Sequence, residues 1–251
     1  MKFQIKNIFS KKNLIIAVKS FAVIMLLFLV LNLIFPLKTN IEYSKTISDS
    51  NNEILHAYLT ADDKWRMYTE LDEISSELKK AIIFKEDKYF YWHFGVNPIA
   101  IARAFTNNVL KQKRTSGAST ITMQVIRLLK PKKRTYFNKF LEIFNAFQLE
   151  WKYSKGEILQ MYLNLVPYGS NIEGVKSASV LYLDKQPNHL SLAEITALSI
   201  IPNRPTSLMP GKNNELIVQE RNKWLNRFLK HNVFKKEVIE DALTEGFDVK
   251  R

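Results

Sequence analysis

The sequence contains no cysteine and only four histidines among its 251 residues. The lack of cysteine excludes disulfide bonds and thiolate metal sites, and the four histidines are not spaced as zinc ligands. Acidic residues are also scarce, because 24 Asp and Glu stand against 37 Lys and Arg and give a formal net charge of +13. This charge favours an acidic partner, and nucleic acid, an anionic membrane surface and a phosphorylated substrate all fit it.

Glycine and proline are few as well, with seven and eight residues, and the chain shows neither repeats nor low-complexity segments. Hydrophobic residues make up 46% of the sequence, which is enough for one substantial core once the N-terminus is set aside. We therefore expect one folded domain.

The N-terminal region predicts a membrane anchor. Residues 1–13 form a basic tail without an acidic residue, and residues 14–36 are apolar except for Lys19, Ser20 and Asn32. At 1.5 Å per residue this run can cross a bilayer. The positive-inside rule puts the tail in the cytoplasm and the rest of the chain outside. A cleaved signal peptide is the alternative, but residues 36–40 offer no small-x-small cleavage site.

Residues 37–75 predict a stalk with a short strand pair, because apolar residues alternate loosely on both sides of a polar turn at 49–52. Residues 76–251 predict a mainly α-helical domain. Its helices are marked by Asn97-Pro98, by a cap at Ser119 and by a cap at Asn214 before a final long helix. The pairs Ser154/Glu157 and Ser191/Glu194 fit capping boxes. An aromatic stripe over 137–151 predicts a core-facing helix.

Residues 81–151 carry the groups that predict chemistry. Glu86 and Asp87 follow an apolar run, a hydroxyl-rich turn spans 116–124, and Lys139 and Glu142 lie one helical turn apart. Two carboxylates beside a sugar-binding cleft serve glycosyl transfer or glycoside hydrolysis. A hydrolase must protonate its leaving group, whereas a diphosphate leaving group needs positive charge and a base for the acceptor hydroxyl. Six cations near Glu142 favour the diphosphate, namely Arg127, Lys130, Lys132, Lys133, Arg134 and Lys139.

Five ordered motifs over residues 40–230 closely resemble glycosyltransferase family 51, the peptidoglycan glycosyltransferase domain of class A penicillin-binding proteins and their monofunctional relatives. The motifs are Glu86-Asp87-x-x-Phe90-x-x-His93-x-Gly95, residues 117–124, Lys139-x-x-Glu142, residues 158–164 running on to 174–175, and residues 190–202. Met123-Gln124, residues 167–174 and Trp65-Arg66 resemble the C-type proteins. No transpeptidase segment follows, so we expect the monofunctional form.

The resemblance implies a lysozyme-like helical fold with a small membrane-associated jaw, in a single-pass protein of the bacterial inner membrane with a periplasmic domain. It implies that lipid II is polymerised into β-1,4 glycan with inversion and with release of undecaprenyl diphosphate. Glu86 matches the general base, and Glu142 matches the carboxylate near the diphosphate, which acts directly or through Mg²⁺ or Mn²⁺. The substrate-binding positions that it implies are Asp87, Ser119, Thr120, Gln124, Arg127, Arg134 and Lys139.

The implied partners are lipid II, lipid-linked glycan, the membrane and a transpeptidase or other cell-wall synthase, but no nucleic acid. Two positions depart from the family. Asn138 replaces a frequent Arg before Lys139, so Arg134 is expected to supply that charge, and Asp184 replaces a Gly. These departures leave open a catalytically idle scaffold, and the two acids leave open a lysozyme-like enzyme that cleaves murein. Purely structural roles also stay open for four of these residues. Lys139 and Glu142 can form an ion pair on the helix surface, and Asp87 and His93 can stabilise the fold without contacting substrate.

Overall fold

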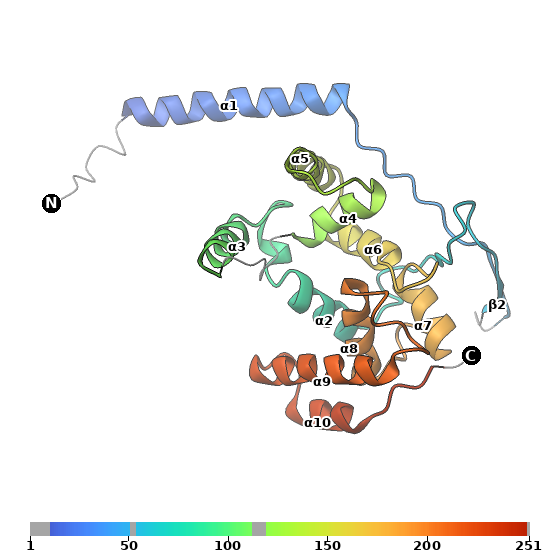
Figure 1. Cartoon of the computed structure of the whole chain (residues 1–251). Helices are drawn as coiled ribbons and strands as arrows, with labels where there is room; N and C mark the ends of the chain where they lie inside the picture. The colour runs from blue at the N-terminus through green and yellow to red at the C-terminus, as the bar shows by residue number, and fades with distance from the viewer. Residues whose placement is uncertain (1–10, 51–53, 112–118, 250–251) are drawn as a thin grey trace. The chain divides into compact units, whose positions relative to one another are not determined.

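The computed structural model describes residues 11–50, 54–111 and 119–249 (Figure 1). Contacts within the chain divide it into two units, residues 1–39 and residues 40–251. The first part of the predicted hydroxyl-rich turn, residues 116–118, lies outside the described residues.

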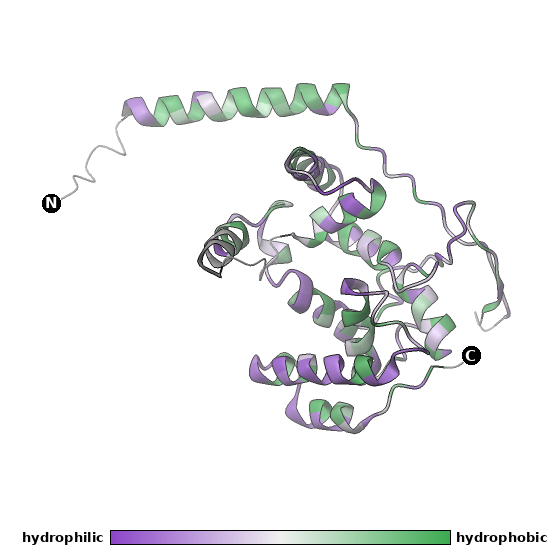
Figure 2. Cartoon of the chain, in the orientation of Figure 1, coloured by the Kyte–Doolittle hydropathy of each residue, from purple (hydrophilic) through white to green (hydrophobic). Residues whose placement is uncertain are grey.

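The first unit contains helix α1 (Lys11–Ile34), which is hydrophobic along most of its length (Figure 2). Its stretch Lys12–Ile34 has a mean hydropathy of 2.9 and is long and apolar enough to cross a membrane. At 1.5 Å per residue α1 is about 36 Å long, compared with about 30 Å for the hydrocarbon core of a bilayer. The predicted long apolar helix is therefore confirmed, while its direction across a membrane stays a prediction.

The second unit begins with the predicted strand pair. Strands β1 (Thr46–Ser48) and β2 (Ile54–Ala57) run antiparallel, with Thr46 opposite Ala57 and Ile47 opposite His56. The chain then becomes helical, as predicted. The helices are α2 (Ser76–Glu86), η2 (Phe90–Trp92), α3 (Pro98–Lys111), α4 (Ile121–Leu129), α5 (Tyr136–Lys152), α6 (Lys155–Leu165), α7 (Val175–Leu183), α8 (Leu192–Ile200), η3 (Ile201–Asn203), α9 (Asn214–Lys230) and α10 (Lys236–Thr244).

Several helices begin at the caps that the sequence predicts. Both predicted capping boxes are present, at the start of α6 and at the start of α8. Asn97 caps α3, since its Oδ1 accepts from the Ala100 backbone N–H at 2.9 Å. Two cap predictions were wrong. Thr120, not Ser119, caps α4. Asn214 is the first residue of α9 and not its cap, and α9 is not the final helix, because α10 follows it.

Helix α8 is the centre of the core. All its residues from Leu192 to Ile200 are buried, and it packs against α2, α7, α9, α10 and η3. A second group is formed by α4, α5 and α6, which contact one another. The stripe predicted to face the core on α5 is wrong in part, because Phe137 is 70% exposed, Phe140 64% and Trp151 55%. Helix α5 instead buries Ala146, Gln148 and Leu149, all in its second half.

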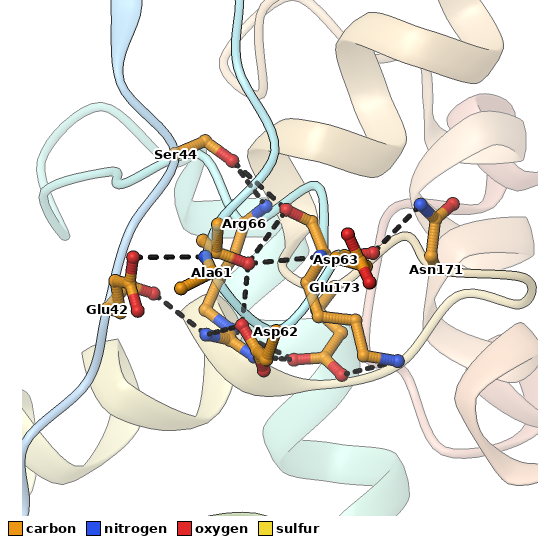
Figure 3. Close-up of polar contacts among 10 residues, drawn as sticks. Glu42, Ser44, Ala61, Asp62, Asp63, Arg66, Asn171 and Glu173 are labelled. Carbon is orange, nitrogen blue, oxygen red and sulfur yellow. Dashed lines mark hydrogen bonds and ion pairs between the residues drawn. The ribbon is translucent and has the colours of Figure 1, made fainter.

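A polar clamp ties the segment after β2 to the loop between α6 and α7 (Figure 3). The buried guanidinium of Arg66 donates from Nε and Nη2 to Glu173 Oε2 at 2.9 and 2.7 Å, and from Nη1 to the Glu42 carbonyl at 2.8 Å. Asp62 accepts from Nη2 at 2.9 Å. Backbone bonds from Trp65 to the same loop complete the clamp. The clamp thus holds the loop that begins with Val166 and Pro167, two residues of the cavity described next.

Candidate active site

A cavity of about 890 Å³ opens between the end of α2, α4, the loop 130–135, α5, α6 and η3. Two carboxylates, those of Glu86 and Glu142, line it. The cations that line it are Lys85, Arg127, Lys130, Lys132, Lys133, Arg134 and Lys139. Cations therefore outnumber carboxylates among the described lining residues, and the cavity favours an anionic ligand.

Glu86 is the last residue of α2, and the helix fixes its position. Ser75 caps the start of α2 by accepting from the Leu78 backbone N–H at 3.2 Å. The helix buries Leu78, Ala81 and Ile82 and packs against α8. This packing carries Glu86 to the cavity wall with its side chain 10% exposed. The Glu86 carboxylate, at the end of a helix packed against the core, thereby faces the cavity but is largely shielded from water.

Three side chains contact the Glu86 carboxylate. Gln124 Nε2 donates to Oε2 at 3.1 Å, and the Lys85 ammonium forms an ion pair with Oε1. Asn203 can be turned in two ways, and the orientation with Oδ1 toward Lys85 satisfies both of its neighbours. In that orientation its Nδ2 donates to Glu86 Oε1 at 3.1 Å, and its Oδ1 accepts from Lys85 Nζ at 2.6 Å. Glu86 is therefore held by residues from α2, α4 and η3.

Asp87 and Thr120 connect the loop after α2 to the start of α4. The Asp87 carboxylate accepts from the Ile121 backbone N–H at 3.1 Å and lies 3.0 Å from His93 Nε2. The Thr120 hydroxyl donates to the Gly95 carbonyl at 2.6 Å and caps α4. Neither residue is among the described residues that line the cavity. The contacts described for Asp87 and Thr120 are with other protein groups, and they join the loop after α2 to the start of α4, the helix that carries Gln124.

Glu142 and Lys139 form the opposite part of the site on α5. Lys139 Nζ donates to Glu142 Oε1 at 2.9 Å and to Ser119 Oγ at 3.0 Å. The side chain of Glu142 is 14% exposed and that of Lys139 is 42% exposed. Lys139 therefore joins α5 to the residue before the cap of α4, which explains why Ser119 does not cap that helix.

The cavity also contains the position of one departure from the family pattern. Asn138 Nδ2 donates to the Lys133 carbonyl at 2.8 Å and helps to fix the loop that carries the cations. Arg134, from the same loop, lines the cavity together with Asn138. The cation that the sequence analysis expected to replace the missing charge is thus part of the same cavity.

Two buried tyrosines lie within reach of the charge on Glu86. Burial, and secondly the charge of Glu86, raise the pKa of Tyr162 well above its usual value, while the charge of Arg127 acts in the opposite direction. Burial and Glu86 also raise the pKa of Tyr168. The Tyr168 hydroxyl has no hydrogen-bond partner within the described part of the chain. Both phenols therefore stay neutral and cannot compete with Glu86 as bases.

The described residues do not build a cage for Mg²⁺ or Mn²⁺. No three His, Asp or Glu side chains gather in the described ranges, and the Glu142 carboxylate is already bonded to Lys139. Magnesium is commonly bound by one or two carboxylates together with substrate phosphates. The Glu142 carboxylate is poorly suited to such a site, because Lys139 already occupies one of its oxygens. The positive charge of the cavity comes from its lysines and arginines.

Most of the residues predicted from the sequence do come together in this cavity: Glu86, Ser119, Gln124, Arg127, Arg134, Lys139 and Glu142 all line it. Lys85, Tyr162 and Asn203 also line it, although the sequence motifs predicted no role for them. Lys85 directly precedes the motif that begins with Glu86, and Tyr162 lies within the motif over 158–164. Their position in or beside these motifs was the sequence signal that could have identified them as site residues. Asn203 is far from Glu86 in the sequence, and no local pattern connects the two.

Comparison with known proteins places these residues in a wider context. A family model described as Transglycosylase matches residues 51–229. Penicillin-binding protein 1C of Escherichia coli (strain K12) is 38% identical over 191 residues, which cover 76% of this chain and 25% of that protein. Penicillin-binding protein 1A of Neisseria flavescens is 33% identical over 207 residues, 82% of this chain and 26% of that protein. The chain thus spans about a quarter of the length of the curated relatives that it matches.

A solved structure is also similar. The crystal structure of penicillin-binding protein 1A from Haemophilus influenzae aligns with a TM-score of 0.47 and 17% identity, over 84% of this chain and 22% of that chain.

Proposed function

The chain belongs to the transglycosylase family, and from that premise we propose that it polymerises lipid II into β-1,4-linked glycan with release of undecaprenyl diphosphate. One observation carries the proposal. Glu86 and Glu142 line the same cavity, and the lysines and arginines around Glu142 line it with them. A base, a charged site for a leaving diphosphate and space for a large polar substrate are therefore combined in one place.

The acceptor sugar is activated by Glu86. Its carboxylate takes the proton from the 4-hydroxyl of the acceptor lipid II, and the oxygen attacks the anomeric carbon of the lipid-linked donor glycan. The buried tyrosines beside it stay protonated. Gln124 and Asn203 hold the carboxylate by hydrogen bonds, and a fixed base removes a proton without a costly reorientation.

The donor bond breaks as the new bond forms. The electron pair of the bond between the anomeric carbon and the diphosphate goes to the diphosphate oxygen, and attack from the opposite side inverts the anomeric centre. A diphosphate is a stable anion, so it leaves without protonation and needs positive charge instead. Arg127, Arg134 and Lys139 supply that charge in the proposal, and Glu142 orients Lys139 through their 2.9 Å hydrogen bond.

The donor is expected to be anchored in a membrane, and the apolar α1 provides the matching anchor. The lysines that precede α1 and the positive-inside rule put the catalytic domain on the outer face of a bacterial inner membrane. A transpeptidase or another cell-wall synthase is the partner that such a glycan strand requires, because polymerisation alone does not crosslink it.

Product analysis tests the proposal against a murein-cleaving enzyme with the same two acids. The full chain in detergent is given labelled lipid II, and separately isolated cell-wall polymer. We expect a long product from lipid II that a muramidase digests, and we expect no soluble fragments from the cell wall. Fragments without polymer would support the hydrolase. A folded protein that produces neither would support a scaffold role, for which Asn138 and Asp184 are the residues to revert.

A further inference from the structure

Lys85 is a buried cation that the mechanism above does not use. Its side chain is 2% exposed, yet it lines the cavity next to Glu86. An ammonium group is strongly hydrated, and its transfer into a protein interior is unfavourable unless charged and polar partners replace the water. The partners of Lys85 therefore indicate what holds it in this place.

Three groups replace that water. The carboxylate of Glu86 is ion-paired with Lys85, and Asn203 Oδ1 accepts from Lys85 Nζ at 2.6 Å when its amide is turned to satisfy both neighbours. The ring of Trp224, on α9, lies with its centroid 5.5 Å from Nζ. An aromatic face at this distance attracts a cation. Two of the three partners come from η3 and α9, more than a hundred residues after Lys85 in the sequence.

The same ammonium and the same amide both contact Glu86 Oε1, which fixes one side of the carboxylate. We propose that Lys85 is a positioning residue that keeps the Glu86 carboxylate aimed into the cavity, and that Asn203 and Trp224 hold Lys85 in place for this task. The proposal rests on the function proposed above, because it assumes that Glu86 is the base.

The other groups around this pair differ from Lys85 in their titration. Gln124 and Asn203 do not titrate. Tyr162 and Tyr168 stay neutral because burial raises their pKa values. Arg127, the cation that acts on Tyr162, and Arg227, whose guanidinium lies 4.5 Å from the centroid of the Trp224 ring, stay charged at any working pH. The group beside Glu86 that changes charge on the alkaline side is therefore Lys85.

Burial lowers the pKa of Lys85 below the usual lysine value, and the charge of Glu86 opposes that shift. A lysine with a lowered pKa loses its proton at a lower pH than an exposed lysine does. The polymerisation rate should consequently fall on the alkaline side at a pH below the ordinary lysine range.

The test is the pH profile of polymer formation from labelled lipid II by the full chain in detergent. Lys85→Gln has no ammonium group at any pH, so we expect a lower rate at every pH and an alkaline limb that moves up into the ordinary lysine range. Lys85→Arg keeps a charge that does not titrate, so it should retain the rate while its alkaline limb moves up. Lys80→Gln is the matched control, because Lys80 is an exposed lysine on the same helix with a similar ring contact, 5.2 Å from the centroid of Phe234. The rate and the alkaline limb should stay unchanged in this control.

A second variant tests the hold on Lys85. Trp224→Leu removes the ring and leaves both charges, so the ammonium is less stabilised and the alkaline limb should move down by about half a pH unit or more. This variant also serves if Lys85→Gln does not fold. An unchanged alkaline limb in folded Lys85→Gln or in folded Trp224→Leu would overturn the inference.

The inference about Lys85 and the proposed function can fail independently of each other. Polymer from the parent and none from Glu86→Gln, with an unchanged alkaline limb in folded Lys85→Gln, would retain the function and reject the inference. If the parent makes no polymer, the proposed function fails, and titration of the Lys85 side-chain carbon Cε by NMR decides. That signal is assigned by its loss in Lys85→Gln. A midpoint that falls in Trp224→Leu but not in Lys80→Gln supports the hold on Lys85, and an unmoved midpoint refutes it.

Discussion

Replacement of Arg66 by Met should destabilise the domain far more than a surface substitution does. Arg66 is 7% exposed, and its guanidinium donates to Glu173, Asp62 and the Glu42 carbonyl (Figure 3). Methionine fills a similar volume but cannot donate a hydrogen bond. The variant would therefore leave Glu173 and the Glu42 carbonyl without their principal donor.

The magnitude follows from the exposure of the partners. Removal of one member of a fully buried ion pair costs about 3 to 5 kcal/mol. Water reaches part of this clamp, because the side chains of Glu173 and Asp62 are 19% and 54% exposed. We therefore expect a loss of about 2 to 3 kcal/mol in the free energy of unfolding. For a domain of this size that loss lowers Tm by about 5 to 10 °C.

Thermal unfolding followed by far-UV circular dichroism measures this change in the full chain. The matched control is Lys64→Met, which removes the other cation near Glu173. Lys64 Nζ lies 3.6 Å from Glu173 Oε1 with its side chain 33% exposed, and an exposed pair contributes about 0 to 1 kcal/mol. Its Tm should fall by no more than about 3 °C. An Arg66→Met variant as stable as this control would refute the clamp.

Three further changes have defined outcomes. Lys139→Ala should lower turnover about a hundredfold, as expected for loss of one charge at the diphosphate, and leave Tm nearly unchanged, since a helix-surface pair contributes only a few tenths of a kcal/mol; a large fall in Tm would mark a structural ion pair instead. Asp184→Gly should raise the free energy of unfolding by about 1 kcal/mol, because Asp184 adopts a left-handed conformation with φ of 54° at the end of α7; denaturant unfolding measures it, and an unchanged midpoint argues against strain. The hydrogen bonds from Arg66 and Thr60 hold the pKa of Asp62 below its usual value. The contribution of Asp62 to stability is therefore present above about pH 4 and is lost as the pH falls through the lowered pKa. Asp62→Asn should flatten the acid side of a plot of stability against pH, and a curve unchanged from the parent would contradict this.

The parts of the fold that depend on short-range contacts could be predicted from the sequence. The capping boxes at Ser154/Glu157 and Ser191/Glu194 each join residues three positions apart, so the groups that meet are visible in the sequence itself. The apolar α1 could be predicted because length and composition alone define it. The start of α4 could not be predicted in this way, because the hydroxyls of Ser119 and Thr120 are both able to cap the helix. Lys139, twenty residues later in the sequence, donates a hydrogen bond to Ser119 and leaves Thr120 as the cap.

The contacts between distant segments were beyond the sequence. The aromatic stripe on α5 has helical spacing, but the number of its residues that are buried depends on how far α4 and α6 cover the helix. The first half of α5 leaves Phe137 and Phe140 exposed. The contacts of Lys85 with Asn203 and Trp224 likewise appear only when η3 and α9 are placed against α2.

The most direct test of the account is the rate at which the full chain forms glycan polymer from labelled lipid II, compared with Glu86→Gln. Glutamine keeps the shape of the side chain, but an amide group replaces one carboxylate oxygen and cannot accept the proton. The account predicts polymer from the parent and a loss of at least about a thousandfold in the variant, with the far-UV circular dichroism spectrum of a folded helical domain in both. A folded Glu86→Gln protein that polymerises at the parental rate would contradict the assignment of the base.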